Sequence, residues 1–200
     1  MMTIKNLLVM SLAAVVLAGC GRKAADGAAT SAQEPAAVTP AADAPGAFDM
    51  ANVPVSDQPL GEFPYFGLPA GYEPLNKPET ADADRFPFWV GDRFEWVEGR
   101  TWMSFIGTTP SKQFSGFEVR KGVEELVRAA GGVKVFDGTV LRAAVQTLGD
   151  DIMVGHNTGI GGIGDQPSSI YVVRRADRNI WLYLNLSTAG GSMTVAESAP

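Results

Sequence analysis

The sequence predicts an α+β domain, in which an antiparallel or mixed β-sheet carries two helices packed on one face. Three patterns in the 200 residues favour this class: two β-rich segments joined by a short turn, a capping-box motif before an amphipathic helix, and a second, shorter helical stripe. Residues 58–198 hold all four tryptophans, all four tyrosines and nine of the ten phenylalanines. We therefore expect one globular domain there, built in packed layers around one core.

The entrance to this domain, residues 61–72, mixes aromatic residues with glycine and proline. That mixture forbids a regular helix and predicts an extended segment lying over the core. Its aromatic residues, Phe63, Tyr65, Phe66 and Tyr72, are candidate contact residues for a partner. Each of them is also explained as an ordinary core residue, and the sequence leaves both interpretations open.

The next predicted element is a hairpin of residues 86–90 and 93–97 around a turn at Gly91, since glycine readily supplies the positive φ of tight turns. After Gly99, which we interpret as a turn or bulge, residues 100–106 form another predicted strand. Apolar side chains alternate onto both of its faces, so this strand is expected in the middle of the sheet.

A helix is predicted to begin at Ser115, which has the capping-box spacing to Glu118. Gly131 follows the helix and supplies its left-handed end. The apolar stripe of this helix has helical spacing and consists of Val119, Val123, Leu126, Val127 and Ala130.

The rest of the domain alternates short strands with one helix. Residues 133–136 are a predicted strand, residues 140–148 a second helix ended by Gly149, and residues 192–197 a last strand after the β-rich segments 170–175 and 180–186. The second β-rich segment alternates cleanly, and one set is expected to face the helices: Ile180, Leu182, Leu184 and Leu186.

The first 20 residues are organised as a secretory signal. Lys5 precedes an apolar run of about eleven residues, which is shorter than the ~20 residues that a transmembrane helix needs. The run ends in Leu-Ala-Gly-Cys at positions 17–20, and Cys20 is the only cysteine of the chain. This stretch resembles the lipobox of bacterial lipoprotein signals, which reads Leu, a small residue, Gly or Ala, and then Cys.

The resemblance implies cleavage between Gly19 and Cys20, a lipid on the Cys20 thiol and a further acyl chain on the new amino group. Each buried methylene contributes ~0.8 kcal/mol, so two or three long chains anchor a protein permanently. Gly21 and Arg22 follow in place of an Asp, which by resemblance favours the outer membrane, with the domain facing the periplasm. The inner membrane and the cell surface stay open, as does an ordinary signal peptide with a chance cysteine.

Residues 20–57 form a predicted tether behind the lipid. Ala, Pro, Asp, Gly, Thr and Ser dominate this stretch, which buries too little apolar surface to fold, so we expect a disordered chain. Its r.m.s. reach is roughly 30 Å. Helical Ala-rich pieces are the alternative, although Pro35, Pro40 and Pro45 interrupt them.

The charge balance argues against nucleic acid as a partner. The chain has 16 basic and 22 acidic residues, and removal of the signal takes away Lys5, leaving 15 − 22 = −7. Nucleic-acid binding needs a basic patch, and the nearest group, Arg174, Arg175 and Arg178, is too small for a groove.

Motifs for cofactors and catalysis are weak. Residues 159–164 satisfy the G-x-G-x-x-G pattern, but Pro167 follows closely where a dinucleotide fold needs a helix, so we predict a surface loop and no cofactor. This loop, residues 155–166, also holds the only histidine, His156, which we include among the candidate contact residues. No metal site is expected.

Carboxylates supply the one open route to catalysis. A glycosidase needs two of them at a suitable separation and no local motif. Solvated turns and faces explain the close pairs of this chain more simply, and these pairs are Asp82 with Asp84, Glu95 with Glu98, and Asp150 with Asp151.

Three runs carry a second resemblance: FPFWVGDRFEWVEGR at residues 86–100, GGVKVFDG at 131–138, and IYVVRRAD at 170–177 with Ile180-Trp181 after it. They are similar to a module that precedes the peptidoglycan-binding domain in some envelope proteins of the outer-membrane-protein-A-like family. The resemblance implies a domain without catalytic residues. Up to Pro200 the chain has no counterpart of the wall-binding residues, so wall binding is not carried over.

Together these patterns predict a lipid-anchored envelope protein whose non-catalytic periplasmic domain binds or supports an envelope protein or a cell-wall component. Two alternatives stay open: a carboxylate-dependent hydrolase of wall glycan, and a domain that sequesters a small ligand in an apolar pocket.

Overall fold

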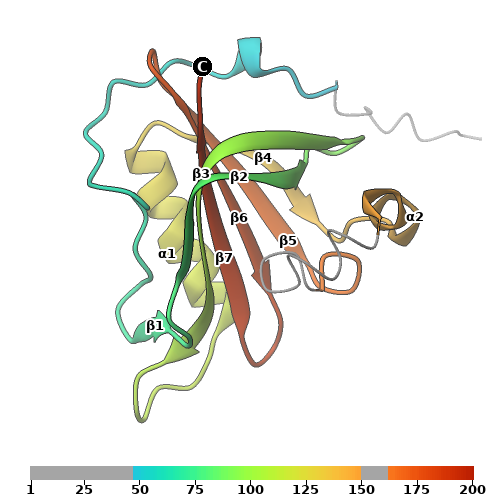
Figure 1. The fold of residues 1–200 in the computed structure, drawn as a ribbon. Coiled ribbons are helices and arrows are strands. Elements are labelled where there is room, and N and C mark those ends of the chain that lie inside the picture. The colour runs from blue at the N-terminus through green and yellow to red at the C-terminus, as the bar shows by residue number, and fades with distance from the viewer. Residues whose placement is uncertain (1–46, 150–161) are drawn as a thin grey trace, which may run out of the picture. The chain divides into compact units, whose positions relative to one another are not determined.

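The computed structural model describes residues 47–149 and 162–200 (Figure 1). Its elements in chain order are η1 (Met50–Asn52), β1 (Tyr72–Pro74), β2 (Glu79–Trp89), β3 (Phe94–Thr108), α1 (Gly116–Ala129), β4 (Val133–Gly138), α2 (Arg142–Val145), η2 (Gln146–Leu148), β5 (Ser168–Arg174), β6 (Asn179–Leu186) and β7 (Gly191–Ser198).

Seven strands form one sheet in the order β1-β3-β7-β6-β5-β4, with β2 also pairing to β3. All six strand pairs are antiparallel, so the predicted α+β class with an antiparallel sheet and two helices is confirmed. β3 is central, as predicted, because β7 pairs with one of its edges while β1 and β2 pair along the other. The second strand of the predicted hairpin and the predicted strand after Gly99 are one continuous strand, β3, which pairs with β2.

The helix face of the sheet, as we call the side toward α1, is built as the sequence predicts except at Leu126, a predicted member of the α1 stripe that is 42% exposed. The Ser115 side chain caps α1 by accepting a hydrogen bond from the Glu118 amide at 3.3 Å. Val119, Val123 and Val127 are buried in one cluster with the alternating apolar residues of β6. The apolar stripe of α1, at helical spacing, therefore packs against the alternate apolar side chains of β6, and each set buries the other.

The hairpin face is the opposite side of the same sheet, and the end of the β2–β3 hairpin covers it (Figure 1). Phe88 packs on Trp181 of β6 with 5.3 Å between ring centroids, and Phe86 packs on Tyr183 with 5.7 Å. The hairpin therefore folds back over the strands instead of extending the sheet.

Gly99 marks the point on β3 where the hairpin leaves β7. Its φ of 151° is one that side-chain-bearing residues rarely adopt, and a Cβ there would overlap the carbonyl oxygen of Glu197. The partner strand β2 has a register shift between Ala81 and Asp84 at the same level. The predicted turn or bulge at Gly99 is thus a bend within a continuous strand.

The second helix differs from the prediction in position. Val145 of α2 and Leu148 of η2 belong to the hairpin-face cluster, so the two helices lie on opposite faces of the sheet, and the expectation of one shared face is wrong. The reason is that the aromatic hairpin leaves this face incompletely covered, and the apolar residues after β4 complete it.

The predicted tether boundary at residue 57 is also wrong within the described residues. Val53 is buried in the hairpin-face cluster, Val55 forms a parallel bridge with Arg174, and the Ser56 hydroxyl donates to the Ala130 carbonyl oxygen at 2.7 Å. The prediction used the average composition of the Ala- and Pro-rich stretch, and that average hides the few apolar residues at its C-terminal end. The folded unit therefore begins before Met50.

Candidate functional site

The predicted contact segment, residues 61–72, lies along the helix face and divides into buried and accessible aromatic residues. Phe66 and Tyr72 are 4% and 7% exposed and belong to the core around α1. Both rings also line a surface hollow at this segment, so a contact role for Phe66 and Tyr72 remains a prediction. Phe63 and Tyr65 are only partly buried and pack on the outside of that core.

Tyr65 is the centre of a polar cluster. Its hydroxyl donates to the Glu197 carboxylate and accepts a hydrogen bond from Arg178 Nη1 at 3.0 Å. Arg178 also bonds Glu197 at 3.3 Å and, through Nη2, Asp177 at 2.7 Å. Burial and the Glu197 carboxylate raise the pKa of the Tyr65 phenol, although Arg178 opposes them, so the hydroxyl keeps its proton at neutral pH.

The backbone and the neighbouring ring hold Tyr65 in place. Its φ is 68°, in the left-handed region that non-glycine residues occupy rarely and that is enriched at binding sites. The ring of Phe63 meets Tyr65 edge-on, with 5.6 Å between centroids, and the Arg100 guanidinium lies 4.3 Å from the Phe63 centroid. Tyr65 is thus an ordered aromatic group with one polar end.

Tyr72 takes over part of the predicted capping box. Its hydroxyl donates to Glu118 at 2.7 Å and accepts from the Ser115 amide at 3.1 Å, the bond that a capping box assigns to the glutamate. Lys112 also bonds Glu118, and these two partners lower the pKa of the Glu118 carboxyl. Tyr72 is therefore a structural residue that joins β1 to the start of α1.

A surface hollow of about 430 Å³ lies between this segment and β1. Trp102 and Met193 form its buried floor, Tyr65 is part of its wall, and the lining includes two carboxylates, Glu62 and Glu73, and no basic side chain. Such a hollow suits an apolar or aromatic group of a partner, with the carboxylates at its border selecting against anions.

Sequence reasoning missed Arg178 and Glu197, the partners of Tyr65. They lie 113 and 132 residues further along the chain, and no local motif connects them with the aromatic segment. Only the antiparallel pairing of β6 with β7 brings Arg178, in the turn before β6, next to Glu197. The site is a product of the sheet topology.

The other predicted site residues are outside the described residues: Gly19, Cys20 and His156. Part of the glycine-rich stretch is described, and it forms a turn in which the Gln166 amide donates to the Gly162 carbonyl oxygen at 2.7 Å. Ile163 in this turn is 1% exposed, and β5 follows at Ser168 in place of a helix. The described part therefore lacks the helix N-terminus that a dinucleotide site needs.

The carboxylate pairs within residues 47–149 are on the hairpin. Asp82 is fully exposed and lies 3.8 Å from Arg100, while Glu95 lies 3.2 Å from Arg93. Asp150 and Asp151 are outside the described residues. In residues 47–149 and 162–200, no three His, Cys, Asp or Glu side chains are grouped so that they could hold a metal ion.

None of the helices in the described part of the chain has the length and apolar character needed to cross a membrane. No protein-family model matches the chain, and a search of curated proteins found no match. The function is therefore inferred from the residues and their geometry.

Proposed function

We propose that this chain is a lipid-anchored bacterial envelope protein whose periplasmic domain binds or supports another envelope component without catalysing a reaction. The observation that carries the proposal is the sequence Leu-Ala-Gly-Cys at positions 17–20, directly after an apolar run too short to span a bilayer. The lipid on Cys20 holds the protein at the outer membrane, and the domain works within the reach of its tether.

The structure supports a binding role through the hollow beside Tyr65. An ordered aromatic residue with a polar end, next to a concave apolar floor, is a common arrangement at protein interfaces, where tyrosine and arginine are enriched. The partner presents an apolar or aromatic group there, and the net negative charge of the chain disfavours nucleic acid as a partner.

The anchor is tested with Cys20→Ser in cells grown with radiolabelled palmitate. We expect the parent to incorporate label and to sediment with outer membranes, and the variant to lose both properties. Ser11→Ala, within the apolar run, is the matched control and keeps both. Equal labelling of the Cys20→Ser variant refutes the anchor.

The binding role is tested by blocking the hollow. Gly67 lines it, and a Cβ at Gly67 meets no atom within 4 Å, so we expect Gly67→Trp to place a bulky ring at the hollow while the fold is kept. Gly61→Trp is the matched control, since Gly61 also has open space but does not line the hollow. An envelope component that crosslinks to the parent and to Gly61→Trp, but not to Gly67→Trp, supports the proposal; equal crosslinking to all three refutes this surface.

A further inference from the structure

A second hollow, of about 710 Å³, lies along β4 at the other end of the sheet order from β1. Five consecutive residues of β4, Val133 to Asp137, line it. Successive side chains of a strand point to opposite faces, so a cavity that touches all five reaches the strand from its edge. In the described part of the chain β4 pairs only with β5, which leaves its outer edge facing this hollow.

The wall opposite β4 turns the edge into a slot. It consists of residues 47–53 with η1 and of the hairpin turn at Val90 to Asp92. Phe48 and Val53 on one side and Val133, Val135 and Phe136 on the other give the slot an apolar lining, and all of them pack on the hairpin-face core. The slot is therefore formed by ordered elements.

Where β4 has not yet begun, the edge of the neighbouring strand β5 accepts an extended segment of this chain. β4 begins at Val133, opposite Val172 of β5, and two residues further along β5 Val55 makes a parallel bridge to Arg174. The Ser56 amide donates to the Arg174 carbonyl oxygen at 2.8 Å. The segment around Val55 thus pairs with β5 as an added strand, just beyond the start of β4.

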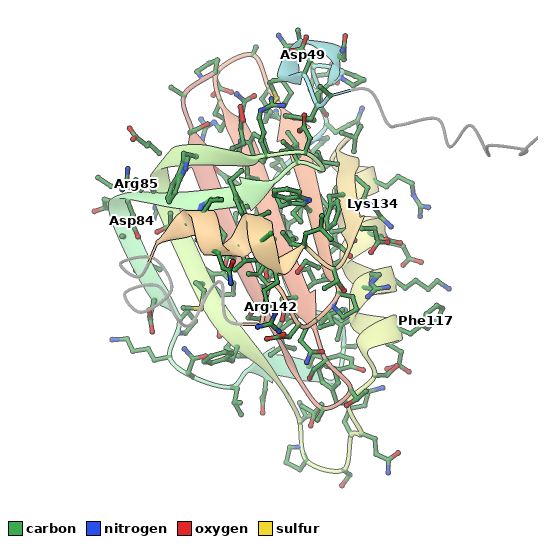
Figure 2. All side chains as sticks on the ribbon, turned by 90° about the vertical axis from the view of Figure 1, so that its right-hand side faces the viewer. Asp49, Asp84, Arg85, Phe117, Lys134 and Arg142 are labelled. Atoms are coloured by element: carbon green, nitrogen blue, oxygen red, sulfur yellow. The ribbon has the colours of Figure 1, made fainter. Side chains whose placement is uncertain are left out.

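The charges of the slot select its occupant. Its lining holds three carboxylates, on Asp49, Asp92 and Asp137, and a single ammonium, on Lys134. Lys134 is already bonded to Glu124 of α1 and lies 2.9 Å from Asp137, and Figure 2 shows it beside α1. Asp49, the N-cap of η1, stands at the top of the domain. Arg93, which is not part of the lining, pairs with Asp92 at 3.2 Å, so the three carboxylates of the slot and Glu124 still outnumber the two cations. An occupant with basic side chains complements this excess of negative charge.

We propose that the edge of β4 binds an extended segment of a partner protein by strand addition, and that this segment alternates apolar residues with lysine or arginine. Backbone hydrogen bonds to β4 supply affinity, the apolar lining takes one set of side chains, and the carboxylates take the basic set. The short length of β4 and its register shift between Lys134 and Phe136 limit unselective pairing. That the partner is an envelope protein rests on the proposed function; the edge site itself does not.

The test is a selection from a random-heptapeptide library on the full lipidated chain in detergent micelles. Selected peptides are expected to alternate apolar and basic residues and to slow hydrogen exchange of the β4 amides. Val135→Lys, which places a charge in the slot, is expected to abolish binding. Asp92→Asn, at an exposed turn, is expected to weaken binding ~2- to 5-fold, as for one exposed ion pair. Asp82→Asn on β2 removes the same charge outside the slot and is expected to leave binding unchanged.

Several outcomes overturn the proposal: no enriched peptide, peptides without basic residues, equal binding to Asp92→Asn and the parent, or protection outside β4. Concentration-dependent dimerisation of the parent that Val135→Lys abolishes also overturns it, since a second copy of the chain then occupies the edge. Because Asp92→Asn leaves the core intact, the proposal stays falsifiable even where Val135→Lys does not fold. Failure here leaves crosslinking at the hollow beside Tyr65 unaffected, and loss of the lipid anchor leaves peptide binding unaffected.

Discussion

The two faces of the sheet are covered in different ways. On the helix face, α1 supplies 14 consecutive residues whose cap, stripe and end are all local features of the sequence. On the hairpin face, aromatic residues of β2 meet residues of β6 that are distant in the chain, as in the pair Phe88 and Trp181, which are 181 − 88 = 93 residues apart. The helix α1 that covers one face is thus encoded locally, whereas the cover of the hairpin face depends on contacts that only the complete fold provides.

The difference extends to polar chemistry. Charged groups border the helix face, where the Tyr171 hydroxyl donates to Glu124 at 3.1 Å and Lys134 bonds Glu124 and Asp137. The hairpin face is closed by rings, with Phe88 and Tyr183 both fully buried. We therefore expect core truncations to have their largest effects on the hairpin face and changes of pH to act on the helix face.

The largest expected effect is that of Phe88→Ala. Phe88 is fully buried between Phe86 and Trp181, so truncation removes its burial and leaves a cavity, at a cost of about 3–5 kcal/mol in the free energy of unfolding. Urea titration followed by tryptophan fluorescence measures this loss. Phe117→Ala on α1 is the matched control: Phe117 is 75% exposed, points outward in Figure 2, and should change stability by less than ~0.5 kcal/mol. Equal losses at the two positions contradict the description of the hairpin face as core.

Gly99→Ala tests the bend that carries the hairpin over the sheet. The added Cβ overlaps the Glu197 carbonyl oxygen and the φ of 151° is strained, so we expect a loss of roughly 2–4 kcal/mol. Gly67→Ala, in open space, is the control and should stay close to the parent. Thermal unfolding measures both losses. A Gly99→Ala variant as stable as the parent would contradict the requirement for glycine at this bend.

The same distinction explains how much the sequence predicts. The cap at Ser115, the stripe of α1 and the alternation of β6 are local signals, and the structure confirms them except for Leu126, which is exposed. The first seven residues of β2, residues 79–85, carry no strand pattern in the sequence: they are polar and mostly exposed, and pairing with β3 holds them extended. Of the predicted contact surface, Phe63 and Tyr65 remain partly accessible, whereas burial of Phe66 depends on how β3 and α1 meet, which no local pattern encodes.

Ser115→Ala tests the helix face at one of its local signals, the cap of α1. Removal of the hydroxyl leaves the Glu118 amide without its cap, for which we expect a loss of about 1 kcal/mol. Ser115→Asp keeps an acceptor at the same place and should restore most of the stability. Because Tyr72 still holds the Ser115 amide, helix content by circular dichroism should be unchanged in both variants. A loss as large as that of Phe88→Ala contradicts the local character of this face.

The smallest expected effect is a pH dependence that belongs to the border of the helix face. Burial alone raises the pKa of the Asp137 carboxyl, but hydrogen bonds from Lys134 and Ser169 and nearby positive charge lower it below its ordinary value. The stabilisation is therefore complete above about pH 4, where the unfolded carboxyl is ionised, and is lost as pH falls through the lower folded pKa.

Asp137→Asn should reduce the difference in unfolding free energy between pH 6 and pH 3 by less than ~1 kcal/mol, since the pair is partly exposed. Lys134→Met should reduce the same difference, and the double variant should add little to either change, because both substitutions remove one interaction. If the two single effects add in full, Asp137 and Lys134 act on stability independently, and the charged border of the helix face is a set of separate surface groups.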